Sequence, residues 1–171
     1  MRTPFAVSLA VILTTSPLAY AQNEPTVRVG PWTIATVYKA DKFDSCTMGR
    51  SADGLEIGFA LTRDGLLLML DSPKWKLERG KAYTVRLAAG ALSIDAKALA
   101  DTKSVTIPLA DSPFNGKLRS SSMMEVRGEG ATLRVPLDGS TAALDRLDVC
   151  FEKNSRESAQ TNPFVAPSRK P

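Results

Sequence analysis

The chain has 171 residues, no histidine, two cysteines and a formal net charge of +4. The missing histidine excludes Ser-His-Asp and Cys-His catalysis and histidine metal sites. The weakly basic balance suits solubility and attraction to anionic polymers, but it is too small for a nucleic-acid-binding surface, so we expect no nucleic-acid partner.

The first 21 residues have the features of a secretory signal peptide. Arg2 supplies the positive charge, Phe5 to Leu13 form a short apolar core, and Ala19-Tyr20-Ala21 matches the small-residue cleavage pattern. The apolar run is shorter than the ~20 residues that span a bilayer. We therefore expect cleavage after Ala21, a periplasmic or secreted protein, and no transmembrane segment in the mature chain.

Most of the mature chain alternates apolar and polar residues with a period of two, which is typical of antiparallel strands that face a core on one side. Strands are expected at residues 27–29, 32–38, 55–61, 83–87, 92–96, 105–109, 124–126 and 133–137. The run Leu66 to Leu70 does not alternate, which indicates a strand that is buried on both faces or covered on its outer face.

Turn signals fall between these runs. Asp53-Gly54 and Asp64-Gly65 are typical of tight hairpins. Pro108 and Pro136 lie inside strand-like runs, which places them on edge strands or at strand ends. Many short strands at regular spacing predict a mainly β fold, an antiparallel β-sandwich or barrel-like domain.

Two stretches interrupt the strand pattern. In the first, Ser112 is a candidate N-cap and Pro113 suits the first helical position, while Gly116 limits the prediction to one short helical turn.

The second stretch predicts a C-terminal helix that ends near Cys150. Asp138 or Ser140 is its candidate N-cap. Leu144, Leu147 and Cys150 are spaced three residues apart, so they share one helical face, which we expect to lie against the core.

After Phe151 the chain is polar and shows no periodicity, which is typical of a flexible tail. The predicted organisation is therefore a signal peptide at 1–21, a single β-rich domain at 22–151 and a flexible tail at 152–171.

The two cysteines are expected to form one structural disulfide. Oxidising compartments pair thiols, and Cys46 and Cys150 are the only cysteines of the chain. The loop that the bridge closes has about 100 residues, for which the chain-entropy model gives about 4–5 kcal/mol as an upper figure.

No catalytic, cofactor or metal motif stands out. The chain lacks S-x-x-K, G-x-G-x-x-G and P-loop patterns, so we expect no enzyme activity and no cofactor. Asp41 and Asp44 are too few to hold calcium, and no metal site is predicted. Four carboxylates remain as candidates for a glycosidase pair: Glu56, Glu125, Glu129 and Glu152. No local pattern selects two of them.

A basic-aromatic stretch, Asp71 to Lys81, is the candidate binding patch for a glycan, a lipid headgroup or a partner protein. Its residues are Lys74, Trp75, Lys76, Arg79 and Lys81. Alternation favours the other interpretation, in which Trp75 and Leu77 point into the core from a strand and the lysines point outward. Core packing is also the favoured interpretation for Trp32 and Tyr38.

Several short motifs together resemble a known group of proteins. They are GPWTI at 30–34, FDSCTM at 43–48, PKWKL at 73–77, GKAYTV at 80–85 and TAALDRLDVC at 141–150. With these the chain resembles a largely uncharacterised group of small exported proteins of alphaproteobacteria, and it is more distantly similar to the invasion-associated locus B family. The resemblance covers residues 30–150. It implies a β-sandwich-like periplasmic protein with a late helix, linked to host-cell interaction, and it carries over no functional residues.

These observations predict an exported, non-catalytic binding or envelope-associated protein with a host-interaction role implied by the resemblance. Its expected partners are an envelope or host protein or an anionic envelope polymer. Two alternatives remain open: a proteinaceous inhibitor of a hydrolase such as lysozyme or a protease, and a carboxylate-based hydrolase of envelope glycans.

Overall fold

A computed structural model of the chain describes residues 26–160, with side chains described up to Arg156. The predicted signal peptide, its cleavage site after Ala21 and residues 161–171 of the predicted tail lie outside the described residues. Neither helix of the described part is long and apolar enough to cross a lipid bilayer.

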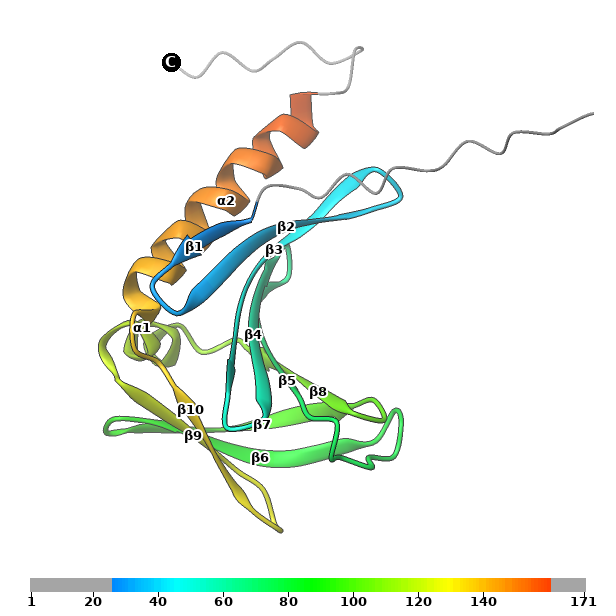
Figure 1. The fold of residues 1–171 in the computed structure, drawn as a ribbon, viewed down its shortest axis with the longest axis vertical. Helices are drawn as coiled ribbons and strands as arrows, with labels where there is room; N and C mark the ends of the chain where they lie inside the picture. Colours follow the sequence, from blue (N-terminus) through cyan, green and yellow to red (C-terminus); the bar gives the residue numbers. More distant parts are fainter. Residues whose placement is uncertain (1–25, 161–171) are drawn as a thin grey trace, which may run out of the picture.

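The described chain folds into one antiparallel sheet of ten strands with two helices. The strand order is β1-β2-β3-β4-β5-β8-β7-β6-β9-β10, and the sheet curls around a single core (Figure 1). The mainly β, barrel-like fold with a C-terminal helix is confirmed. The strands are β1 (Val27–Val29), β2 (Trp32–Lys39), β3 (Lys42–Ala52), β4 (Leu55–Thr62), β5 (Gly65–Asp71), β6 (Ala82–Ala89), β7 (Leu92–Ala100), β8 (Ser104–Leu109), β9 (Met123–Arg127) and β10 (Thr132–Pro136).

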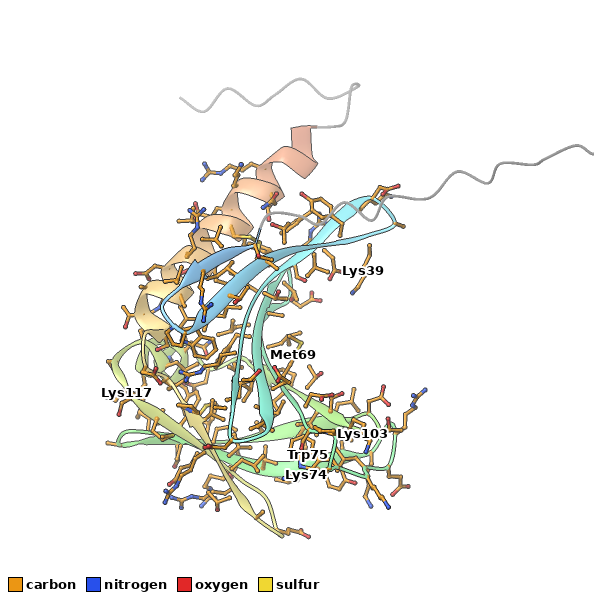
Figure 2. The ribbon with its side chains drawn as sticks, in the orientation of Figure 1. Lys39, Met69, Lys74, Trp75, Lys103 and Lys117 are labelled. Atoms are coloured by element: carbon orange, nitrogen blue, oxygen red, sulfur yellow. A yellow bond between two sulfur atoms is a disulfide. The ribbon has the colours of Figure 1, made fainter. Side chains whose placement is uncertain are left out.

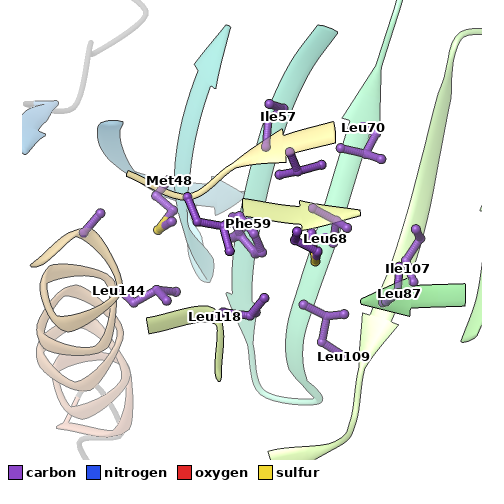
Figure 3. Close-up of a cluster of buried hydrophobic side chains, with 14 of the residues drawn as sticks. Met48, Ile57, Phe59, Leu68, Leu70, Leu87, Ile107, Leu109, Leu118 and Leu144 are labelled. Atoms are coloured by element: carbon purple, nitrogen blue, oxygen red, sulfur yellow. The ribbon is translucent and has the colours of Figure 1, made fainter. Parts of the chain in front are cut away.

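The centre of the core is a row of side chains that crosses neighbouring strands in register. Ile34, Met48, Phe59, Leu68 and Ile107 face one another from β2, β3, β4, β5 and β8. All five are buried, and Figure 3 shows four of them side by side within the sheet's concave face. The predicted alternation of apolar and polar residues is what brings these side chains to one face.

The longest strand, β3, was absent from the sequence prediction. The β2–β3 turn consists of Ala40 and Asp41, which both have positive φ angles of 48° and 59°. A two-residue hairpin turn of this kind usually contains glycine, so the local turn signal is missing. Asp44, considered above as a calcium ligand, is instead a residue of this strand and pairs with Lys39 at 2.9 Å.

Strand β5 lies in the interior of the sheet, between β4 and β8. Leu68 and Leu70 are fully buried on the core face, while Leu67 and Met69 are half-buried on the outer face. Met69 lies over Gly58 of β4, where the glycine leaves room for it. The non-alternating run therefore reflects an outer face that is covered by its own side chains.

Helix α1 (Ser112–Ser120) is longer than the single turn predicted, and it begins one residue earlier than expected. Its N-cap is Asp111, whose carboxylate accepts a hydrogen bond of 2.7 Å from the Phe114 backbone N–H. Ser112 was therefore the wrong cap. Phe114 and Leu118 are buried, and their packing offsets the low helix propensity of Gly116.

Replacing the cap tests this assignment. Asp111→Ala is expected to lower the free energy of unfolding by about 1 kcal/mol, because the N–H of Phe114 loses its acceptor. Ser112→Ala, one residue away and exposed, is the matched control and should change little. Chemical denaturation of both variants measures the two free energies of unfolding. An equal loss of stability in the control would contradict the role of Asp111.

Helix α2 (Ser140–Gln160) packs on β2 and β3 and continues well beyond the predicted end of the domain. Leu144 and Leu147 are buried and Cys150 is half-buried, so the predicted inward face is confirmed. Residues 152–160, predicted to belong to the tail, are helical. They contain good helix formers and an i,i+4 pair between Glu152 and Arg156, but no apolar face that a periodicity argument could detect.

The start of α2 is fixed by tertiary contacts. The Asp138 carboxylate accepts from Arg50 at 2.7 Å, and its backbone carbonyl accepts from the Trp32 indole N–H at 2.9 Å. The Ser140 hydroxyl donates to the Leu118 carbonyl at 2.8 Å. The two candidate caps thus connect the helix to β2, β3 and α1.

The disulfide between Cys46 and Cys150 is present. It joins the middle of β3 to α2 across a sequence separation of 104 residues, with the two Cα atoms 6.2 Å apart. Because Cys46 is fully buried, the bridge lies between the helix and the sheet, and it is an architectural feature.

Candidate binding site at the 72–81 loop

Residues 72–81, the 72–81 loop, connect β5 to β6 and form no strand. Backbone hydrogen bonds tie the loop to the β7–β8 connection and to the end of β7. The N–H of Ser72 donates to the carbonyl of Lys103 at 3.0 Å, and that of Leu77 donates to the carbonyl of Thr102 at 3.0 Å. The N–H of Gly80 donates to the carbonyl of Ala100, the last residue of β7, at 2.8 Å. The loop lies at the end of the sheet that is remote from both helices (Figure 1). Its conformation is therefore set by a segment that lies twenty or more residues away in the sequence.

Trp75 is half-buried and packs against the core. Lys74 and Lys76 on either side of it are exposed. The interpretation in which Trp75 points inward and the lysines outward therefore describes the arrangement, although the segment is a loop and not a strand. Trp32 is buried as expected, whereas Tyr38 is 42% exposed, so core packing was the wrong expectation for it.

Two cations of the predicted patch have acidic partners. Arg79 binds Asp101 at 2.9 Å, and Lys81 binds Glu78 at 3.1 Å. The hydrogen bond that the Lys81 ammonium group donates to the Glu78 carboxylate raises the pKa of Lys81. The pKa of Asp101 is lowered mainly by the backbone N–H of Thr102 and further by Arg79. These two cations therefore add little net positive charge to the loop.

Lys74, Lys76 and Lys103 together form what we call the basic patch. No carboxylate of the described residues lies within ion-pair distance of these three lysines. Lys103 comes from the β7–β8 connection, and its ammonium group donates to the Pro73 carbonyl. Figure 2 shows Lys74, Trp75 and Lys103 gathered at one corner of the molecule.

Lys103 is the residue of this patch that sequence reasoning missed. It is 30 residues from Pro73, and only the pairing of β8 with β5 brings it to the loop. No local signal in the sequence identifies it. A hollow of about 450 Å³ lies between the two segments. It is lined by Trp75, Lys76, Leu77, Glu78, Thr102 and Lys103.

A second, larger cavity lies on the inner side of the loop. Its volume is about 610 Å³, and Trp75 and Leu77 also belong to its lining. The loop thus forms a wall between an outer basic hollow and an inner, mainly aliphatic cavity. The sequence did not predict this cavity, because its walls come from six strands whose order in the sheet cannot be read from local patterns.

The four candidate carboxylates are distributed over β4, β9, the β9–β10 turn and α2. Glu56 accepts a hydrogen bond from Ser51, Glu125 binds Arg127, and Glu152 binds Arg156. Glu129 lies at the mouth of the inner cavity. Within residues 26–156, no three acidic or cysteine side chains are grouped closely enough to hold a metal ion.

Comparison with solved structures identifies a similar fold. The crystal structure of invasion associated protein B from Bartonella henselae superposes with a TM-score of 0.54 and 21% sequence identity. The match covers 74% of this chain and 96% of that chain.

The two proteins share a fold.

This agrees with the distant similarity to the invasion-associated locus B family that the sequence motifs indicated. No family model matches the chain, and the search of curated proteins finds no match. At this level of identity, the likeness to invasion associated protein B concerns the architecture. The ligand has to be argued from the residues of this chain.

Proposed function

We propose that this protein is an exported, non-catalytic, envelope-associated binding protein whose basic patch binds anionic lipid headgroups. The observation that carries the proposal is the group of three lysines around Trp75 without a carboxylate partner. Export is supported by the signal-like N-terminus and by the long-range disulfide, which suits an oxidising compartment. The fold of invasion associated protein B is consistent with an extracytoplasmic protein.

The physical basis is electrostatic attraction at a defined corner of the surface. Lys74, Lys76 and Lys103 are exposed and come from two segments that backbone hydrogen bonds hold together. Each lysine near an anionic membrane surface contributes about 1 kcal/mol of attraction, and the attraction falls as salt is added. Three such lysines support weak, reversible association.

Charge reversal within the patch tests the proposal. We expect the mature protein to co-sediment with vesicles that contain phosphatidylglycerol and not with pure phosphatidylcholine vesicles. Lys74→Glu/Lys76→Glu should weaken this binding by at least about tenfold, because attraction becomes repulsion. The matched control, Lys42→Glu/Lys153→Glu, makes the same change in net charge at two exposed lysines away from the loop.

The control separates a local site from a general charge effect. If both double variants lose binding equally, net charge alone attracts the vesicles and the basic patch is not the site. If the wild type binds neither kind of vesicle at low salt, the headgroup proposal is overturned. Retained binding in the control together with loss in the loop variant supports it.

A further inference from the structure

The inner cavity beneath the 72–81 loop has the size and lining of a ligand site. Its volume of about 610 Å³ falls within the ~300–1,000 Å³ of small-molecule pockets, which often occur at the mouths of β-barrels. Aliphatic side chains from six strands form its walls. They are Leu70, Val85, Ala98, Val105, Ile107, Val126 and Leu133.

The charged and polar side chains of the lining are exposed or half-buried, so we take them to mark the mouth of the cavity. Lys81, Thr84 and Glu129 line it there and are exposed, and Tyr83 is half-buried. The aliphatic walls offer no side-chain hydrogen-bonding group. A polar ligand group placed deep inside would lose its hydrogen bonds to water without replacement. The part of a ligand that enters the cavity must therefore be apolar.

We propose that this cavity binds the acyl chain of a single-chain amphiphile, whose polar end remains at the mouth. Branched aliphatic walls suit a hydrocarbon chain, and the aromatic residues Trp75 and Tyr83 occupy the border between the apolar interior and water, as such side chains commonly do. The ammonium group of Lys81 lies 5.4 Å from the centre of the Tyr83 ring.

The ion pair between Lys81 and Glu78 does not keep Lys81 from a polar headgroup. Lys81 and Glu78 are both largely exposed, and exposed pairs of this kind exchange readily with other partners. With Lys81 and Glu129, the mouth offers one cation and one anion to a headgroup. The cavity site is separate from the basic patch, because the cavity lining contains none of Lys74, Lys76 and Lys103.

The test uses cis-parinaric acid, a fatty acid whose fluorescence rises in an apolar environment. The mature wild-type protein is expected to bind it saturably at one site. Ala98→Leu should weaken binding by about tenfold or more, because the buried Ala98 faces the cavity and the larger side chain occupies it. Ala142→Leu adds the same atoms at an exposed position of α2 and should bind like the wild type.

A second cavity variant guards against misfolding of the first. Leu133→Phe adds volume from the edge strand β10, where Leu133 is only half-buried, and it should also weaken binding. Circular dichroism verifies that each variant is folded. Unchanged binding in two folded cavity variants, or binding that does not saturate, would overturn the acyl-chain assignment.

Competition experiments with the bound probe distinguish the source of the acyl chain. Displacement of the probe by palmitate points to a free fatty acid, and displacement only by lysophosphatidylglycerol points to a membrane lipid; displacement by neither overturns the proposal. Lys74→Glu/Lys76→Glu should bind cis-parinaric acid normally. Failure of the cavity site and failure of the basic patch can therefore be told apart.

Discussion

Removal of the Cys46–Cys150 disulfide is expected to lower the free energy of unfolding by about 4 kcal/mol. The bridge spans 104 residues, and a closed loop of this length strongly restricts the unfolded chain, which is the main source of the stabilisation. The double variant Cys46→Ser/Cys150→Ser, followed by urea unfolding, gives the measurement. Both positions are changed together so that no lone thiol remains.

Reduced wild-type protein provides the control for the serine substitutions. It should unfold at nearly the same urea concentration as the double variant, because both lack the covalent link. A loss below about 1 kcal/mol in both would contradict the expected effect. It would mean that the unfolded chain is already compact enough for the bridge to add little.

Trp32→Ala is expected to cost about 3–5 kcal/mol, since it removes a large aromatic side chain from the core. Trp32 is fully buried, and its ring meets that of Phe59 edge to face with centroids 5.8 Å apart. The substitution also leaves the carbonyl of Asp138 without its hydrogen bond from the indole. Thermal or urea unfolding with the disulfide intact measures the loss.

Trp32→Phe separates the two contributions. It keeps most of the apolar volume and removes the indole N–H, so we expect a clearly smaller loss, on the order of 1–2 kcal/mol. If it costs as much as Trp32→Ala, the hydrogen bond to Asp138 that holds the start of α2 outweighs the packing. That result would contradict the present assignment of the energy to core burial.

Local patterns were sufficient to predict most strands, the inward face of α2 and the partner of each cysteine. They were insufficient for β3, because its preceding turn is built from Ala40 and Asp41 and carries no glycine signal. They were also insufficient for the pairing of β5 with β8. That pairing depends on how the whole sheet curls around one core, and strand order is not encoded in any single segment.

The candidate binding site was only partly predictable, because some of its residues are brought together by the folded sheet. Lys74, Trp75 and Lys76 are adjacent in the sequence, and alternation predicted the direction of their side chains although they form no strand. The charge of the patch could not be predicted from the local sequence. The negative charge of Asp101 offsets the positive charge of Arg79, and Lys103 adds a positive charge to those of Lys74 and Lys76. Both Asp101 and Lys103 belong to the β7–β8 connection, which only the folded sheet brings beside the loop.

The disulfide also makes the segment from Cys46 to Cys150 a closed covalent ring. The 72–81 loop, with its two hollows, lies inside that ring. A single protease cut in the loop would open the ring but would release no fragment, because the sulfur bridge and the β5–β8 pairing still join the two pieces. The loop of the proposed binding site can therefore be cleaved without separating the strands that line the cavity.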